Sequence, residues 1–186
     1  MDDKRNPSFE ELSEEFSQPL FGYLRRMSGN AADADDLLQE TLLKIAKGLS
    51  TFEHRSSVKT WAFRIATNVA IDFLRRSAKA QFIEFDESDR PSGIDEEERL
   101  ILDEMNSCVR EVIDRLPPDY RAAVVLFHLE GRTLAEISEI CSISLAATKV
   151  RVHRARARLQ EALNKECTFY SSGAGNLRCA RKDCKS

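Results

Sequence analysis

The spacing of apolar residues is the feature that most constrains the fold of this chain. These residues recur at steps of three and four, which places them on one face of an α-helix, and the first half contains no alternating strand pattern. Ser8 and Glu11 have the spacing of a capping box, so a helix is predicted to begin near residue 8. Its predicted inner face consists of Leu12, Phe16, Leu20, Leu24 and Met27.

The same spacing predicts two more helices in the first half. One follows Asn30 and has acidic residues near its N-terminal end, where the helix dipole favours negative charge. The other runs from about residue 57 to residue 76. Their predicted inner faces are Leu38, Leu42, Ile45 and Leu49 for the earlier helix, and Trp61, Ile65, Val69 and Phe73 for the later one.

An acidic segment separates the two halves of the chain. Residues 82–104 contain ten carboxylates, two arginines and a Pro-Ser-Gly sequence, a composition that favours solvated chain over packed structure. We therefore predict an all-α fold of two small helical domains, the second built around a helix-turn-helix. The predicted divisions are a first domain at 1–81, a flexible acidic linker at 82–100, a second domain at 101–163 and a C-terminal tail at 164–186.

The second half has the pattern of a helix-turn-helix. Helices are predicted over 100–116 and 119–129, the latter capped by Asp119 after two prolines. Thr133 and Glu136 repeat the capping-box spacing and begin a short helix that ends near residue 141. Ser144 can then cap a long last helix, so two helices are joined by a short turn.

The last predicted helix combines a packing stripe with a cationic surface. The stripe consists of Thr148, Val152, Ala155 and Leu159. The cations around it are Lys149, Arg151, Arg154, Arg156 and Arg158. Such a helix suits the major groove of DNA, although a solvated surface or a site for an acidic protein would have a similar composition.

Taken together, the motifs of both halves resemble an extracytoplasmic-function sigma factor, the compact two-domain promoter-recognition subunit of bacterial RNA polymerase. The likeness spans about residues 9–163. It is carried by Asp35–Thr41 (DDLLQET), Trp61–Asn68 (WAFRIATN) with Asp72 and Arg75-Arg76, Leu116-Pro117 with Arg121, Gly131–Ile137 (GRTLAEI) and Thr148–Arg156 (TKVRVHRAR). The chain departs from the family pattern at Ala146, Ala147 and Thr148, where many relatives have Gly, Thr and Val, and at Ser142, where Gly is usual.

The resemblance implies three binding surfaces. One would dock on the clamp helices of the largest polymerase subunit, although any solvated helix can show a similar polar face: Asp36, Gln39, Glu40 and Lys44. The next would capture a flipped base of the minus-ten promoter element and contact nearby DNA: Phe52, His54, Arg55, Ser57, Lys59, Trp61 and Asn68. The last would read the minus-thirty-five element: Lys149, Val150, Arg151, His153, Arg154 and Arg158.

Some of these residues have a second interpretation from their position alone. Trp61 leads an apolar stripe and is more often a core residue than a ligand. Arg64 and Arg75 share a helix face with Asn68, and they can contact DNA or pair with acidic neighbours.

The expected partners are core RNA polymerase, promoter DNA and an anti-sigma factor. Membrane insertion is not expected, because the longest apolar run, Ala122–Phe127, is far shorter than a bilayer span. The N-terminus also has no apolar segment behind its charges, so a cytoplasmic protein is expected. No glycine-rich phosphate loop, H-E-x-x-H pair or nucleophile elbow is present, so no enzyme activity is expected.

Two other functions remain open at this point. A helix-turn-helix regulator that binds closed duplex would need neither the polar face around Glu40 nor the loop at Phe52. A metal or thiol sensor would use the tail cysteines Cys167, Cys179 and Cys184, for which we predict a regulatory metal or redox site. Their spacing lacks the C-x2-C hook of common zinc modules, and a disordered basic tail is the competing interpretation. No other cofactor is predicted.

Overall fold

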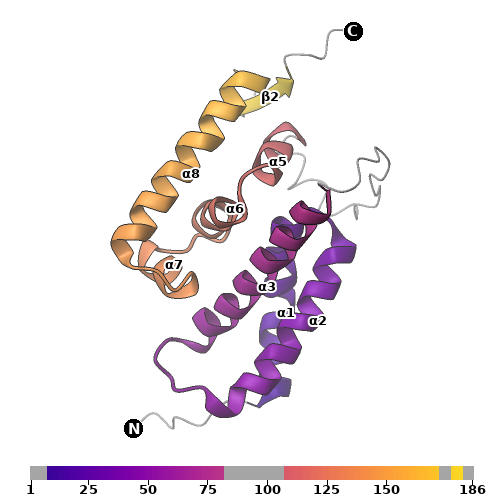
Figure 1. Ribbon diagram of the computed structural model, residues 1–186, viewed down its shortest axis with the longest axis vertical. Helices are drawn as coiled ribbons and strands as arrows, with labels where there is room; N and C mark the ends of the chain where they lie inside the picture. The colour runs from indigo at the N-terminus through magenta and orange to yellow at the C-terminus, as the bar shows by residue number, and fades with distance from the viewer. Residues whose placement is uncertain (1–7, 82–106, 172–176, 182–186) are drawn as a thin grey trace.

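The computed structural model describes residues 8–81, 107–171 and 177–181, and helices dominate these ranges (Figure 1). The first body contains α1 (Phe9–Ser28), α2 (Ala31–Gly48), the 3-10 turn η1 (Leu49–Thr51) and α3 (Val58–Gln81). The second body contains α5 (Ser107–Asp114), α6 (Pro118–Val124), the π-helical turn η2 (Val125–Leu129), α7 (Leu134–Ile140) and α8 (Leu145–Glu166). The predicted linker lies outside the described residues.

The predicted helix starts at Ser8 and Thr133 are confirmed as capping boxes. The Ser8 hydroxyl accepts a hydrogen bond from the Glu11 amide at 3.2 Å, and the Ser8 amide donates to the Glu11 carboxylate at 2.7 Å. Thr133 and Glu136 make the same reciprocal pair at the start of α7. Both contacts satisfy backbone amides that a helix leaves without internal partners.

The predicted inner face of α1 is buried, whereas that of α2 is fully buried only at Ile45. The fully buried residues of α2 are Ala34, Leu37, Thr41 and Ile45. Leu38, Leu42 and Leu49 are only partly buried. The prediction followed the large aliphatic residues of α2. It overlooked Ala34 and Thr41, where a small or polar side chain lets α1 and α3 approach closely.

Helix α3 is buried over a wider arc than its predicted stripe. Ala62, Phe63, Ala66 and Ala70 are buried, but of the four predicted inner residues only Val69 is fully buried. The reason is that α3 lies between the α1–α2 pair and the α6–α7 part of the second body, so two of its sides are covered (Figure 1). Its small residues allow these close approaches.

The start of α6 corrects the prediction that Asp119 caps this helix. Pro117 is the N-cap and Pro118 the first helical residue, a position where proline is favoured because its missing amide would have no partner. The amides of Tyr120 and Arg121 bond to the Pro117 carbonyl at 2.8 and 2.9 Å. The Asp119 side chain is therefore available for contacts with other elements.

A short antiparallel hairpin follows α8 and was not predicted. It pairs β1 (Cys167–Ser171) with β2 (Leu177–Arg181), so that Cys167 is aligned with Arg181 and Phe169 with Cys179. The two bodies themselves confirm the all-α prediction. None of the helices in the described ranges combines the length and apolar character needed to cross a bilayer.

Candidate nucleic-acid interface

Helices α7 and α8 form the predicted helix-turn-helix. The turn between them contains Ser142 at φ 53°, a left-handed conformation that favours glycine. The Ser144 hydroxyl then accepts a hydrogen bond from the Ala147 amide at 3.2 Å, which confirms it as the cap of α8. Thr148, Val152 and Ala155 are buried, so the predicted packing stripe anchors α8 on the second body.

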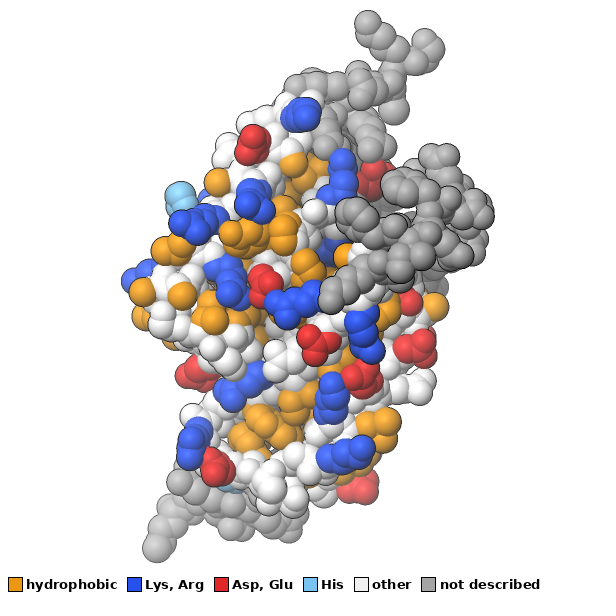
Figure 2. All heavy atoms as spheres, in the orientation of Figure 1, with side chains coloured by type: hydrophobic (Ala, Val, Ile, Leu, Met, Phe, Trp, Pro, Cys, Tyr) orange, Lys and Arg blue, Asp and Glu red, His pale blue; other side chains and the backbone are white. Residues whose placement is uncertain are grey.

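The opposite side of α8 is exposed and carries positive charge. Lys149, Val150, His153 and Arg154 from the predicted set are all exposed. Figure 2 shows Lys and Arg side chains gathered along this helix, with hydrophobic side chains between them. A capped and anchored helix with a cationic outer face has the form that enters a major groove.

Two of the residues predicted to contact DNA from α8 also have partners within the protein. Arg151 Nη1 lies 3.4 Å from the Asp119 carboxylate, and the Arg151 side chain is 26% exposed. The Arg158 guanidinium lies 4.7 Å from the ring centroid of Tyr120, within the range of a cation–π contact. Both contacts join the basic side of α8 to α6.

The loop before α3 is built around a group of three aromatic rings. Phe52 is buried, with its ring centroid 4.7 Å from that of His54 and 4.9 Å from that of Trp61. Trp61 is partly buried and packs on Gly48, where an added Cβ would lie 3.0 Å from Cζ2 of its ring. Phe52 and Trp61 therefore support the loop, while exposed His54, at φ 54°, lies at its surface.

The remaining predicted minus-ten residues are polar and lie at the surface. Ser57 caps α3, because its hydroxyl accepts a hydrogen bond from the Thr60 amide at 3.0 Å. Arg55 forms an exposed ion pair with Glu53 at 2.7 Å. Lys59 and Asn68 are exposed on the first three turns of α3. Exposed cations and an exposed imidazole therefore lie in the same segment as the aromatic group.

The polar face of α2 contains an apolar residue that the sequence analysis missed. Asp36, Gln39 and Lys44 are exposed, and Lys44 pairs with Glu40 at 2.8 Å. Leu43 lies among them with 61% of its surface exposed. The sequence indicates its exposure only through its position, because this leucine is not among the positions of α2 that are buried.

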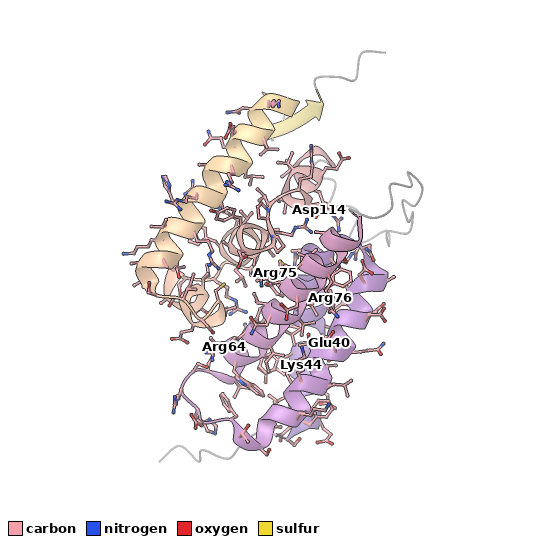
Figure 3. The ribbon with its side chains drawn as sticks, in the orientation of Figure 1. Glu40, Lys44, Arg64, Arg75, Arg76 and Asp114 are labelled. Carbon is pink, nitrogen blue, oxygen red and sulfur yellow. The ribbon has the colours of Figure 1, made fainter. Side chains whose placement is uncertain are left out.

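Arginines of α3 lie on the same side of the molecule as this polar face. Figure 3 shows Glu40 and Lys44 on α2 beside Arg75 and Arg76 on α3. A hollow of about 390 Å³ between the two helices is lined by Glu40, Asp72, Arg75 and Arg76. The surface is therefore polar and mixed in charge, which suits a protein partner or the phosphates of DNA.

Arginines also make the contacts between the two bodies. The side chain of Arg121 is buried and donates to the Met27 carbonyl at the end of α1 at 2.7 Å. Further polar contacts across the boundary are Arg26 with Glu130 at 2.9 Å, Arg75 with Asp119 at 3.0 Å, Arg64 Nε with the Glu139 carbonyl at 3.0 Å, and Arg110 with the Gly29 carbonyl at 3.3 Å. Arg75 thus pairs with an acidic neighbour, as one of its two predicted interpretations has it, whereas Arg64 donates to a backbone carbonyl.

The described part of the chain contains no site for thiol or metal chemistry. Burial raises the pKa of the Cys141 thiol to about 11, so it is protonated at neutral pH and a poor nucleophile. Among the described residues no cluster of three His, Cys, Asp or Glu side chains is placed to hold a metal ion. For Cys167 and Cys179 only the backbone register is described, and Cys184 lies outside the described residues.

Comparison with known proteins gives two family matches. The family described as Sigma-70 region 2 matches residues 12–80, and the one described as Sigma-70, region 4 matches residues 106–159. The first match covers α1 to α3, with the polar face of α2 and the aromatic loop. The second covers the helix-turn-helix.

Individual relatives match over most of the chain. RNA polymerase sigma factor SigZ of Bacillus subtilis is 31% identical over 174 residues, which are 91% of this chain and 95% of the relative. ECF RNA polymerase sigma factor SigE of Mycolicibacterium smegmatis is 31% identical over 171 residues, 90% of this chain and 66% of the relative. Among solved structures, the sigma factor RpoE in complex with the anti-sigma factor NepR from Bartonella quintana has a TM-score of 0.62 at 27% identity, covering 84% of this chain and 96% of that one.

Proposed function

Because the chain belongs to the sigma-70 family of RNA polymerase sigma factors, and to its extracytoplasmic-function type, we propose that it uses three separate surfaces to bring core polymerase to promoters. Sigma factors direct transcription initiation and are generally not enzymes. We infer that this chain likewise supplies only recognition and help with melting, while polymerase forms the phosphodiester bonds. Its place of action is then the cytoplasm, where polymerase and promoter DNA are found.

The polymerase-docking surface is the exposed side of α2. Glu40 and Lys44 pair with each other, so their side chains are held in one geometry, and Asp36 and Gln39 extend the polar surface. Leu43 lies at the centre of this surface and is 61% exposed, so it adds an apolar contact to the polar ones. The match of this region to Sigma-70 region 2 supports a protein partner for the surface.

The minus-ten surface is the loop before α3 with the first turns of that helix. His54 packs against buried Phe52 with the two rings tilted by 52°, and it is itself exposed, so a base pulled from the duplex can stack on the imidazole. Lys59, Arg55 and Asn68 surround that position and can contact the displaced strand. In this assignment Phe52 and Trp61 position the loop.

The minus-thirty-five surface is the outer side of α8. The observation that carries the proposal is that the second helix of a helix-turn-helix is anchored by buried Thr148, Val152 and Ala155 and exposes Lys149 and Arg154 on its other side. Such a helix can enter a major groove with its N-terminal half toward the bases. A regulator confined to closed duplex would leave the α2 surface and the aromatic loop without a role.

An anti-sigma factor is the proposed regulatory partner. The solved sigma factor RpoE, which shares this fold, is in complex with the anti-sigma factor NepR. A second solved structure, CnrH in complex with the cytosolic domain of CnrY, has a TM-score of 0.61 at 23% identity, a likeness that supports the fold. We infer that this chain is held by a protein of the same general role.

The docking assignment is tested by charge reversal on α2. Glu40→Lys places two like charges at the Glu40–Lys44 pair and is expected to weaken binding to core polymerase at least tenfold, while the helical content stays unchanged. Glu15→Lys makes the same change at an exposed position of α1 and is the matched control. Affinity is measured by competition with a labelled sigma factor for core enzyme. Equal affinities of the two variants would contradict the assignment.

A further inference from the structure

From Leu145 to Ala157 the outermost residues of α8 are apolar, although the helix as a whole is basic. Each residue of an α-helix advances by about 100°, so the positions opposite Thr148, Val152 and Ala155 are those of Val150 and Ala157. Val150 is 48% exposed and Ala157 is exposed. The centre of the surface that enters the groove therefore carries methyl groups, with the cations at its sides.

The N-terminal end of the helix extends this apolar centre. After the capping residue, Leu145 is 44% exposed, and Ala146 and Ala147 are exposed too. Ala146 lies one turn before Val150 on the same side of the helix. None of these side chains can donate or accept a hydrogen bond, in the part of a recognition helix that meets base edges.

The major groove offers one apolar group to such a surface, the C5 methyl of thymine. Apart from the small C5–H of cytosine, the other features of the base edges there are hydrogen-bond donors or acceptors. An apolar side chain pressed against such a group would remove its water and leave it without a partner, which is unfavourable. Lys149, His153 and Arg154 lie to the sides of Val150, where they can reach phosphates or a neighbouring guanine.

We propose that Val150, with Ala146 beside it, recognises thymine methyl groups, so that T·A pairs occupy the centre of the minus-thirty-five element of this sigma factor. Specificity at those pairs comes from apolar contact, and the flanking cations supply affinity. The proposal rests on the assignment of α8 to promoter recognition and goes beyond it, because it names the base and the group that is read.

The test begins with a selection. Holoenzyme made from the full chain and core polymerase transcribes a template library randomised upstream of a fixed minus-ten region, and the enriched upstream sequences are read. Synthetic templates carrying the enriched element are then made with single thymines replaced by uracil. This change removes one methyl group and leaves every hydrogen-bonding atom in place.

The expected result is a loss confined to one or two thymines. Uracil there should lower competitive run-off transcription about fourfold with the wild-type chain, the effect of burying one methyl-sized group. Val150→Ala should transcribe the thymine and uracil templates equally. Lys149→Ala, the control on the adjacent position, should lower transcription from both templates and preserve the fourfold ratio between them.

Two results would overturn the proposal. In the first, no replacement of thymine by uracil lowers transcription by the wild-type chain. In the second, uracil lowers transcription by Val150→Ala as much as it does with the wild-type chain. Failure of the underlying assignment has a different signature. If α8 does not read the promoter, the library shows no enriched upstream element, and Lys149→Ala transcribes as the wild-type chain does.

Discussion

Ser142 occupies a backbone conformation that its side chain disfavours. Its φ of 53° lies in the left-handed region, in the turn that sets the angle between α7 and α8. Non-glycine residues held there cost about 1 kcal/mol or more, whereas glycine enters the region freely but loses more entropy on folding. The departure from the family's usual glycine, visible in the sequence, therefore has a structural consequence.

Replacing Ser142 by glycine should stabilise the protein. The expected gain in the free energy of unfolding is about 0.5–1 kcal/mol. Glycine relieves the backbone strain, and the greater conformational entropy that it gives the unfolded chain offsets part of that gain. Chemical denaturation followed by circular dichroism measures it. Ser142→Ala is the control, because alanine keeps the strained conformation and should give no gain. A Ser142→Gly variant no more stable than Ser142→Ala would contradict this account of the turn.

At the scale of elements, the junction of α2 and α3 depends on the fit between Gly48 and Trp61. An added Cβ at Gly48 would lie 3.0 Å from the indole ring, which in turn supports Phe52 and the exposed His54. The position of the proposed base-stacking surface is thus set by contact between two helices.

Gly48→Ala should displace the indole and disturb the loop. Trp61 is the only tryptophan of the chain, so its fluorescence reports the change directly, and the emission maximum should shift to longer wavelength as the ring moves toward water. Promoter opening, measured by permanganate reactivity of thymines, should fall while core binding is retained. Gly22→Ala is the control, because its Cβ would meet only the flexible end of Arg26, at 3.3 Å. Unchanged emission in Gly48→Ala would contradict the proposed support of the loop.

Local signals predicted the elements better than their packing. The capping boxes at Ser8 and Thr133 and the cap at Ser144 depend on residues three positions apart, so sequence alone was sufficient to find them. The buried phase of α2 and the wide buried arc of α3 depend on which helices lie beside them, and this information is not local. Leu43 was missed for the same reason, since its exposure follows from the phase of α2.

In the candidate site, too, local features were predicted better than contacts between elements. Residue type and spacing identified the exposed cations of α8 correctly, but not the partners of Arg151 and Arg158, which come from α6. Asp119 was predicted as a helix cap, and the two prolines before it take that role instead. Its carboxylate is then shared by Arg75 and Arg151, residues far apart in the chain that no sequence pattern brings together.

At the scale of the whole molecule, the two bodies are joined by arginine contacts and by a shared apolar core. Asp119 of α6 pairs with both Arg75 of α3 and Arg151 of α8, so α6 links the helices of the proposed minus-ten and minus-thirty-five surfaces in one compact arrangement. Promoter elements centred about 25 base pairs apart are separated by about 85 Å of B-DNA, at 3.4 Å per pair. The arrangement in the structure therefore has to open before both elements can be bound.

Opening should depend on salt and on Asp119. Ions screen exposed charge pairs, so the radius of gyration measured by X-ray scattering should rise with salt concentration. In Asp119→Ala the rise should occur at lower salt, because both bridging ion pairs are lost. Asp72→Ala is the control: it removes a carboxylate 4.0 Å from the same Arg75 but within one helix, and should behave as the wild type does. Identical salt curves for the two variants would contradict this role of Asp119.

The central claim is that this chain makes core polymerase start at promoters. Run-off transcription tests it most directly, with purified core enzyme, the full chain and a template library of upstream regions. The account predicts transcripts of defined length that appear only when the chain is added, and that disappear when Glu40→Lys replaces it. If the chain binds duplex DNA but core polymerase yields the same transcripts with and without it, the claim is wrong, and the chain is a regulator of closed duplex.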